Sequence, residues 1–385
     1  MKAEHLKDAD MKQTGTLIVG ASISGMACAA CLTKAGLDYI IIEKNNLVAM
    51  PWRNHYDRLH LHTNKKLSTL PYKKYPANVP LYPKRLQVVE YLDNYQQDFN
   101  INPCFNTEAK SIIREDEFWV TETNNEVIKS KNLVMCTGPF GQPRKMDVHG
   151  METFPGNIIH SSQYKTGRDY KGKNVLVIGF GNSACEIALD LFEQGAFPSM
   201  SVRSAVNVLP RDIFGIPVLQ LGLLMAVLPP RVADKLNAPL INFLTGDITK
   251  LGLKKLPYGP LEQIQKDQSV PLLDIGTLKL IREGNCKIFA GIERIENKTV
   301  YFSDGKINDF DAIVAAIGYH KGFEDNVLHV DKSRFEDLNV NAGKQKYFGK
   351  DGLYFCGFFI SPTGQIREIA LDAQKIAGDI IKKRQ

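Results

Sequence analysis

The sequence predicts an α/β protein with two Rossmann-like dinucleotide-binding domains, one inserted into the other. Three observations support this prediction. A glycine turn at Gly20 to Gly25 and a second at Gly179 to Gly181 each follow a short apolar run and open a helical stretch. Both stretches lead to another apolar run, which gives the strand, turn, helix, strand order of a mononucleotide-binding unit. A further apolar run at 310–319 leads to a final amphipathic helix.

The first unit comprises TLIV at 16–19 as a strand, a helix to about Lys34, and YIIIE at 39–43 as the next strand. Gly20 allows the tight turn, and Gly25 allows the helix to pack closely on its strand. Ser22 stands at the middle position of GxGxxG, so its hydroxyl must replace the close backbone approach that glycine permits. A plain βα turn without a ligand is the alternative.

The remaining elements follow from the same patterns. Strands are predicted at 118–123, 132–138, 174–179, 200–203 and within 352–359, and helices are predicted through about Glu193 and after Gly364. PFGQPR at 139–144 predicts a linker, and SDGKINDF at 303–310 predicts the return linker. The predicted domains are a first domain at 1–150 that continues at 306–385, and an inserted domain at 151–305.

Composition excludes several other classes. The 385 residues are 44% hydrophobic and 23% charged, as in ordinary globular proteins. The net charge of +6 is spread along the chain, so we expect no nucleic-acid partner. The N-terminus lacks the apolar core of a signal peptide, and no apolar run of about 18 residues spans a membrane. We therefore expect a cytoplasmic enzyme, and we predict no metal site.

Two further features have alternative interpretations. The seven cysteines suit reduced thiols, and the pair Cys28 and Cys31 is expected to pack in the core rather than to perform redox chemistry. The apolar stretch 213–228, interrupted by glycine and proline, is expected to wall or cap a pocket, with contact to a membrane surface as the alternative.

The residues at the ends of the second strands distinguish the two cofactors. Glu43 ends the strand of the first unit, where a carboxylate can accept hydrogen bonds from adenosine ribose hydroxyls, as FAD binding requires. Arg203 holds the matching place in the second unit and can pair with a 2′-phosphate, which favours NADPH. An ordinary exposed arginine is the alternative for Arg203.

FAD and NADPH in one chain imply hydride transfer from nicotinamide to flavin. The final acceptor remains open at this point. A disulfide, a quinone or electron carrier, and dioxygen all suit reduced flavin. The single CxxC lies on the predicted pyrophosphate helix, which makes a disulfide the weaker choice.

The segment FPGNIIHSSQY places Phe154, Gly156, His160 and Tyr164 at the spacing FxGxxxHxxxY. This spacing resembles the identifying sequence of the flavin-containing monooxygenases. Four longer stretches resemble the YUCCA-type enzymes of that family: 246–262, 271–281, 310–319 and 352–358. The resemblance implies a flavin hydroperoxide that inserts one oxygen atom into a substrate while NADP stays bound. We interpret the signature residues as a structural brace, with His160 as a hydrogen-bonding partner rather than a general base.

The resemblance also implies roles for the segment PWRNHYDRLHLHTNKK. Trp52 and Arg53 match an aromatic and basic pair beside FAD. Asn64 matches an asparagine that contacts nicotinamide and the oxygen adduct, although YUCCA-type enzymes tend to have LPK where this chain has TNK. A side-chain amide can donate to a peroxide and accept from a carboxamide. The alternative is that Asn64 only caps a turn. Gly357 is followed by Phe358 where relatives often have aspartate, which puts the ribityl contact of that aspartate in doubt.

The predicted site residues are therefore one catalytic and nineteen cofactor-binding positions. The catalytic residue is Asn64. The cofactor-binding residues are Gly20, Ser22, Gly25, Glu43, Lys44, Trp52, Arg53, His62, Thr137, Gly138, Gly179, Gly181, Asn182, Ser183, Arg203, Ser204, Gly318, Gly357 and Gln365.

The sequence thus predicts an FAD- and NADPH-dependent monooxygenase that acts with dioxygen on a small organic substrate. That substrate is an aryl 2-oxo acid such as indole-3-pyruvate, which is decarboxylated, or a soft sulfur or nitrogen nucleophile. The rival hypotheses are a flavin-dependent NADPH reductase of quinones or disulfides and a non-catalytic flavoprotein. A homodimer is compatible with the sequence.

Overall fold

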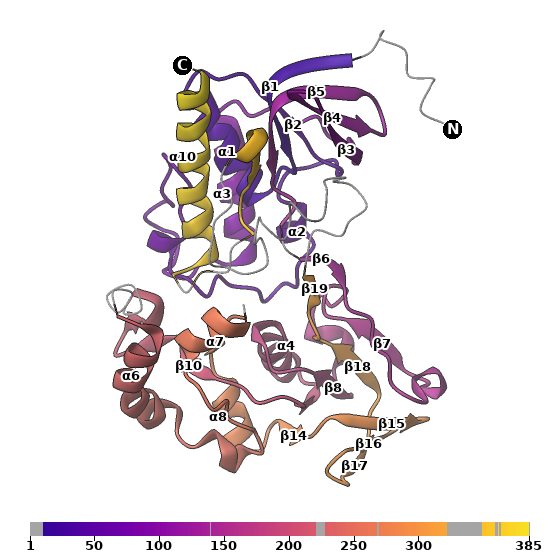
Figure 1. Cartoon of the computed structure of the whole chain (residues 1–385). Coiled ribbons are helices and arrows are strands. Elements are labelled where there is room, and N and C mark those ends of the chain that lie inside the picture. Colours follow the sequence, from indigo (N-terminus) through magenta and orange to yellow (C-terminus); the bar gives the residue numbers. More distant parts are fainter. Residues whose placement is uncertain are drawn as a thin grey trace. The chain divides into compact units, whose positions relative to one another are not determined.

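The structure is a computed structural model that describes residues 11–138, 140–220, 228–267, 269–321, 349–358, 361 and 363–384. The chain folds into two compact units (Figure 1). Unit 1 comprises Met1–Arg53, Asn64–Gly141 and Lys321–Gln385, and unit 2 comprises Asn54–Thr63 and Gln142–His320. Each unit contains one of the two glycine turns.

Unit 1 is built on a six-stranded sheet in which β2, β1, β5 and β20 run parallel. The strands are β1 (Met11–Val19), β2 (Ile40–Ile42), β3 (Ala109–Glu115), β4 (Phe118–Thr123), β5 (Val127–Met135) and β20 (Leu353–Phe355). Strand β5 pairs with antiparallel β4 through its first half and with β20 through its last three residues. The parallel strands β1, β2, β5 and β20 therefore end at one edge.

Helices cover this sheet and complete the core of unit 1. They are α1 (Ile23–Lys34), α2 (Met50–Arg53), η2 (Lys65–Leu67), α3 (Arg85–Asp98), η6 (Lys350–Gly352) and α10 (Gln365–Arg384). The C-terminal α10 packs beside α1 (Figure 1). On the sheet, Leu17, Leu133 and Trp119 form a fully buried cluster with Leu353. The last segment of the chain thus supplies part of the core that supports the first glycine turn.

Unit 2 is built on a five-stranded parallel sheet in the order β14, β9, β8, β18, β7. The strands are β7 (Asn157–His160), β8 (Asn174–Ile178), β9 (Phe197–Ser201), β14 (Lys287–Phe289) and β18 (Ala312–Ala315). The second glycine turn joins β8 to α4 (Asn182–Glu193). Phe289, Phe302 and Phe310 pack around Leu176 in the core of this unit.

Apart from the 16-residue helix α6, the other elements of unit 2 are short. They are η3 (Met151–Thr153), η4 (Gly167–Tyr170), β10 (Val208–Pro210), β11 (Asp212–Ile213), β12 (Ile216–Pro217), α6 (Pro230–Thr245), η5 (Ile248–Leu251), α7 (Pro260–Asp267), β13 (Leu272–Asp274), α8 (Thr277–Arg282), β15 (Ile292–Glu296), β16 (Thr299–Phe302) and β17 (Ile307–Asp309). No helix among the described residues is both long enough and apolar enough to cross a membrane.

The chain leaves unit 1 between Gly141 and Gln142, within the predicted linker 139–144, but it returns between His320 and Lys321, beyond the predicted return linker. Strands β6 (Phe140–Pro143) and β19 (Tyr319–Lys321) pair where the chain leaves and returns. Residues 303–310, expected as the return linker, instead complete the antiparallel sheet β15, β16, β17, because the polar SDGK segment is a hairpin turn. Residues 54–63 join unit 2, which the sequence did not indicate. In the apolar stretch 213–228, residues 221–227 lie outside the described residues, so its role stays a prediction.

Candidate functional site

The first glycine turn has the shape of a phosphate-binding turn. Gly20 has φ +102°, and a Cβ there would lie 2.9 Å from the carbonyl oxygen of Cys136. A Cβ on Gly25 would lie only 1.9 Å from the carbonyl oxygen of Gly20. Ser22 is the N-cap of α1, yet its side chain makes no capping hydrogen bond. The amide groups that begin α1 and the Ser22 hydroxyl can therefore both bind a pyrophosphate.

Glu43 lies at the end of β2 and is 8% exposed. Its Oε2 accepts a hydrogen bond from the Ala21 amide at 2.9 Å, and its Oε1 accepts from the amide and the side chain of Asn45 at 3.0 and 2.6 Å. A carboxylate offers about four acceptor positions, so three bonds leave it capacity for a ribose hydroxyl. The protein thus fixes the orientation of the Glu43 carboxylate at the turn and leaves it able to accept a further hydrogen bond.

The neighbouring strand ends bring further predicted residues to the same edge of unit 1. Thr137 and Gly138 follow β5, and a Cβ on Gly138 would meet open space. Gly357 follows β20 with φ +85°, and a Cβ there would lie 2.3 Å from the Ser24 hydroxyl. Gln365, the first residue of α10, donates from Nε2 to the Gly357 carbonyl at 2.8 Å. The positive φ of Gly138 and Gly357, and at Gly357 the close contact with Ser24, explain these glycines.

Three further residues of unit 1 are predicted to contact FAD, namely Lys44, Trp52 and Arg53. Lys44 is exposed, and Trp52 is half-buried on α2. The Arg53 guanidinium donates to the Val48 carbonyl at 2.9 Å and pairs with Asp93 of α3. Arg53 therefore braces α2 against α3, and its contact with FAD stays a prediction.

Asn64 is fully buried and begins the 3₁₀ turn Lys65–Leu67. Its Oδ1 accepts hydrogen bonds from the amides of Lys66 and Leu67 at 3.0 and 3.1 Å. Its Nδ2 has no hydrogen-bond partner among the described residues. A buried amide donor without a partner is costly and is expected to meet a ligand. The turn-capping alternative is therefore correct for the carbonyl half of Asn64 and leaves the amino group unexplained.

The loop that carries Asn64 is held in place independently of any ligand. The Lys65 ammonium donates to the carbonyls of Pro76, Ala77 and Val79 at 3.2, 2.9 and 2.5 Å. The Lys65 amide also donates to the Leu81 carbonyl at 2.7 Å. Such a fixed backbone orients a donor before its acceptor arrives, which is how polar groups contribute most to stabilising a reacting atom.

The second glycine turn, at the end of β8, repeats this geometry in unit 2. Gly179 has φ +113°, and a Cβ there would lie 2.6 Å from the Ala316 carbonyl oxygen. Gly181 is the N-cap of α4 and faces open space. Asn182 uses its Oδ1 to accept from the Leu273 amide at 3.0 Å, and the Ser183 side chain bonds to Tyr56. The Asn182 oxygen is thus occupied by the protein, while its amino group and the backbone amides of the turn are donors that a phosphate could use.

Arg203 and Ser204 follow β9 and are exposed. The Arg203 stem packs over Gly291, where a Cβ would lie 3.3 Å from Cγ. Among the described residues, no carboxylate lies within ion-pair distance of Arg203. Gly318, beyond β18, has φ +78° and open space at its Cβ position. The carboxyl edge of the unit 2 sheet thus carries a free cation beside a phosphate-binding turn, as an NADPH site requires.

The signature FxGxxxHxxxY forms a brace inside unit 2. Phe154 packs in the core, and a Cβ on Gly156 would lie 2.2 Å from the Asp311 carbonyl oxygen. His160 bonds through Nε2 to the Gly318 carbonyl at 3.0 Å and through Nδ1 to the Ser162 hydroxyl at 2.9 Å. Burial lowers its pKa, which favours the neutral ring. Both ring nitrogens have partners, so a structural role accounts for His160.

The signature tyrosine also identifies residues that the sequence interpretation missed. Tyr164 donates to Asp190 at 2.6 Å, and Tyr56 donates to Glu186 at 2.5 Å. Burial, followed by the Glu186 charge, holds the pKa of Tyr56 well above its usual range. Arg58 forms a two-point ion pair with Glu193 at 2.7 and 2.9 Å.

The three acidic side chains, Glu186, Asp190 and Glu193, are four and three residues apart and therefore share one face of α4. This repeat of acids in an otherwise apolar helix is the signal that could have identified them. His62 lies 3.6 Å from the buried Glu186 and thereby belongs to this network of unit 2.

The pair Cys28 and Cys31 is buried, at 1% and 2% exposure, within α1. Burial raises the pKa of Cys31 to about 11. A thiol of that pKa carries almost no thiolate at neutral pH and is a poor nucleophile. The expected packing role is confirmed, and a disulfide-exchange role on this pair is disfavoured.

Comparisons with known proteins agree with this geometry. The family described as pyridine nucleotide-disulphide oxidoreductase matches residues 17–209. The chain is 38% identical over 383 residues to the indole-3-pyruvate monooxygenase YUCCA6 of Arabidopsis thaliana, with 96% of this chain and 90% of that protein covered. It is 37% identical over 382 residues to the probable indole-3-pyruvate monooxygenase YUCCA3 of the same plant, with 96% and 87% covered.

Solved structures share the fold at lower identity. The flavin-containing monooxygenase from Stenotrophomonas maltophilia aligns with a TM-score of 0.69 at 17% identity, covering 97% of this chain and 100% of that chain. The bacillithiol disulfide reductase from Staphylococcus aureus aligns with a TM-score of 0.68 at 17% identity and the same coverage. The two-dinucleotide-domain fold predicted from the glycine turns is thus confirmed.

Proposed function

The chain belongs to the flavin-containing monooxygenases, in the group of the YUCCA-type enzymes, and from this premise we propose that its substrate is an aryl 2-oxo acid such as indole-3-pyruvate. It is an FAD- and NADPH-dependent monooxygenase. The observation that supports the substrate is the likeness to relatives named for indole-3-pyruvate along 96% of the chain. A small molecule and dioxygen are the reactants, and a homodimer stays a prediction.

The reaction that we propose balances as follows. One aryl 2-oxo acid, one dioxygen, one NADPH and one proton give the aryl acid shortened by one carbon, carbon dioxide, water and NADP. One oxygen atom of dioxygen enters the new carboxylate, and the other leaves in water. When bound, FAD accepts hydride from NADPH and supplies activated oxygen to the substrate.

The residues of the chain have separate tasks in this proposal. In unit 1, the turn from Gly20 to Gly25 and the amides of α1 would bind the FAD pyrophosphate, and Glu43 would accept from its ribose. In unit 2, the turn at Gly179 to Gly181 would bind NADPH, with Arg203 on the 2′-phosphate. Asn64 would donate from Nδ2 toward the reacting oxygen or the nicotinamide amide.

A direct test supplies purified enzyme with NADPH, isotopically labelled dioxygen and indole-3-pyruvate. We expect one labelled oxygen in the arylacetic acid and one carbon dioxide released per NADPH oxidised. The control substrate, phenylpropionate, lacks the 2-oxo group and should give no carbon dioxide. Reduction of quinones or disulfides without oxygen, in the absence of acid product, would support the reductase alternative and contradict the proposal.

Asn64 favours a second candidate, the oxygenation of soft sulfur or nitrogen nucleophiles. Its free amide donor resembles that of heteroatom oxidisers more than the LPK of YUCCA-type enzymes. Thioethers and tertiary amines therefore belong in the same assay. Sulfoxide or N-oxide formation that matches NADPH consumption, with no decarboxylation of 2-oxo acids, would select this candidate.

Replacing Arg203 with glutamine should change coenzyme preference. Hydrogen bonds to a charged phosphate are worth about 1.5–3 kcal/mol, so we expect KM for NADPH to rise roughly tenfold to a hundredfold while KM for NADH stays nearly constant. Steady-state kinetics with both coenzymes measure this shift. The control is Arg168→Gln, which removes an exposed charge that bonds to Gln194 at the other end of α4. Equal loss with both coenzymes would contradict the assignment.

A further inference from the structure

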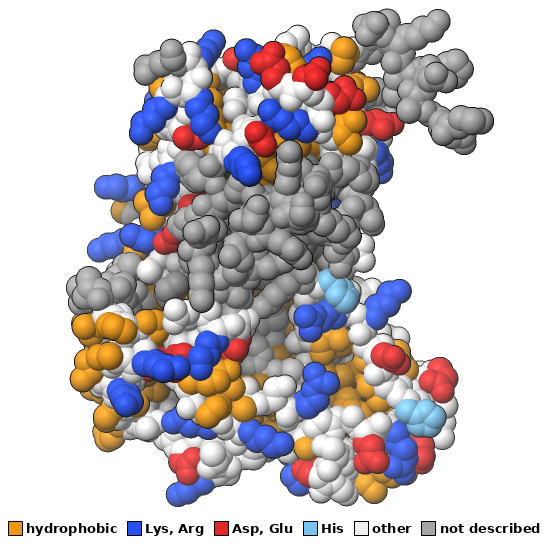
Figure 2. Space-filling view, viewed as in Figure 1, with side chains coloured by type: hydrophobic (Ala, Val, Ile, Leu, Met, Phe, Trp, Pro, Cys, Tyr) orange, Lys and Arg blue, Asp and Glu red, His pale blue; other side chains and the backbone are white. Residues whose placement is uncertain are grey.

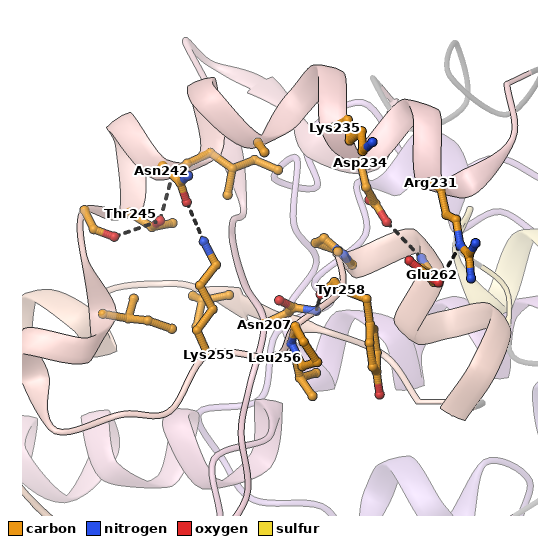
Figure 3. A pocket seen from close by; sticks show the side chains of 18 residues that line it. Asn207, Arg231, Asp234, Lys235, Asn242, Thr245, Lys255, Leu256, Tyr258 and Glu262 are labelled. Atoms are coloured by element: carbon orange, nitrogen blue, oxygen red, sulfur yellow. Dashed lines mark hydrogen bonds and ion pairs between the residues drawn. The ribbon is translucent and has the colours of Figure 1, made fainter.

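A cavity lies within unit 2, between α6 and the segment that leads into α7 (Figure 3). Its volume is about 310 Å³, within the range of small-molecule sites. Most of its wall is apolar. The apolar lining side chains are Val208, Ala238, Ile241, Ile248, Leu256 and Pro257. None of the residues predicted to bind FAD or NADPH lines this cavity. It therefore has room and chemistry for a ligand of its own.

The two carboxylates at the cavity both have partners within the protein. Asp234 is 9% exposed and accepts from the amides of Leu261 and Glu262 at 3.1 and 3.0 Å, which caps α7. Glu262 pairs with Arg231 at 2.8 Å and with Lys266 at 2.7 Å. Figure 3 shows the ion pair of Arg231 with Glu262 and the hydrogen-bonded Asp234 on the same side of the cavity. Glu262 is thus balanced by two cations, whereas Asp234 keeps its charge. The lining side chains together carry one net positive charge, from Arg231, Lys235 and Lys255 against Asp234 and Glu262.

Neither of the two lysines at the cavity forms an ion pair with a residue that the structure describes. Lys255 donates to the neutral Oδ1 of Asn242 at 2.7 Å, and both residues are exposed (Figure 3). Lys235, on α6, has neither an ion pair nor a hydrogen bond with any residue that the structure describes. The Asp247 carboxylate near Lys255 is engaged by the amide and hydroxyl of Thr249. Apolar walls thus adjoin two cations that carry spare donors.

The surface around this part of unit 2 has the same dual character. Hydrophobic side chains gather beside Lys and Arg over α6 (Figure 2). Leu236 and Phe243 of that helix are 62% and 80% exposed. At 100° per residue, Leu236 and Phe243 lie on the face of α6 opposite the residues that line the cavity, so the apolar character of the site comes from its own wall.

We propose that this cavity binds an amphipathic monocarboxylate, with the aromatic or alkyl body against the apolar walls and the carboxylate at Lys255. An ammonium donates to a carboxylate more strongly than to an amide, so the ligand would replace Asn242 as the partner of Lys255. The binding site belongs to unit 2 alone and does not depend on the proposed oxygenation. Aryl acids, both with and without a 2-oxo group, fall in this ligand class.

The test measures binding of 3-phenylpropionate to the FAD-loaded full chain by calorimetry. This probe has no 2-oxo group, so its binding is independent of whether 2-oxo acids are substrates. We expect saturable binding at one site, weakened about tenfold by Lys255→Gln, because a charged hydrogen bond is lost. The control Lys254→Gln removes the neighbouring charge, which does not line the cavity, and should leave the dissociation constant unchanged.

Two further measurements locate the site. Ala238→Phe should fill the cavity and abolish binding, and its flavin content and NADPH oxidation show whether it has folded. The neutral 3-phenylpropanamide should bind about tenfold more weakly than the acid. Absence of binding to the unmodified enzyme, equal affinity for acid and amide, or equal effects of Lys255→Gln and Lys254→Gln would overturn the proposal. If Ala238→Phe fails to fold, the comparison of Lys255→Gln with Lys254→Gln alone tests the proposal.

Discussion

Replacing Gly25 with alanine should yield a protein that no longer retains FAD. The new Cβ would lie 1.9 Å from the Gly20 carbonyl oxygen and 3.4 Å from Ile41 Cδ1. Neither the carbonyl nor the buried strand can move without opening the turn, so α1 must separate from β1. Overpacking of this kind costs about 3 kcal/mol or more. The measurements are flavin content after purification and thermal unfolding followed by circular dichroism.

The matched control is Gly378→Ala in α10. A Cβ at Gly378 would meet no heavy atom within 4 Å, and the residue lies inside a helix that packs against α1. Alanine should stabilise that helix by about 0.5–1 kcal/mol and leave flavin binding intact. If Gly25→Ala retains FAD as firmly as Gly378→Ala, the turn does not hold the pyrophosphate in the proposed way.

Replacing Asn64 with serine should separate its two roles. A serine hydroxyl can still cap the 3₁₀ turn through the amides of Lys66 and Leu67, but it supplies no amide donor. Loss of one fixed donor to a reacting oxygen costs roughly a hundredfold or more in the step that it assists. We expect NADPH consumption to continue while hydrogen peroxide replaces most of the oxygenated product. Product, NADPH and peroxide are measured in one reaction.

Asn64→Ala is the companion variant because it removes the cap as well. It should show the same loss of coupling and an additional destabilisation of about 1 kcal/mol in thermal unfolding. Anaerobic reduction of the flavin by NADPH serves as the control and should be close to normal in Asn64→Ser. If Asn64→Ser couples normally and only Asn64→Ala is impaired, Asn64 is a turn cap and nothing more.

The sequence was most informative where structure is local. Gly20 and Gly179 were assigned correctly to tight turns, and Gly25 to close packing of the helix, because steric limits on φ and on close backbone contact act over a few residues. The strand predicted at 200–203 ends at Ser201 in the structure, which leaves Arg203 in the following loop. The prediction of a return linker at 303–310 was wrong because a polar hairpin turn and a linker share the same composition.

The sequence predicted the site less well wherever two hydrogen-bonded residues lie far apart in the chain. Tyr56 and Glu186 are 130 positions apart, and no periodicity in either segment predicts their hydrogen bond. The free Nδ2 of Asn64 depends on which acceptors surround it after folding. The same holds for the cavity of unit 2, where Arg231 and Lys266 pair with Glu262 while Lys235 and Lys255 form no ion pair with a described residue.

The sequence by itself determined the two glycine turns and the family, while the assignment of Glu43 and Arg203 to different cofactors stays a prediction. These features are short, and their chemistry depends on residue type and spacing alone. Only the tertiary structure decided that residues 54–63 join unit 2, that the signature is a brace against Asp190, and that Asn64 keeps an unpaired donor. Those outcomes depend on the burial and pairing of polar groups far apart in the chain, which folding alone establishes.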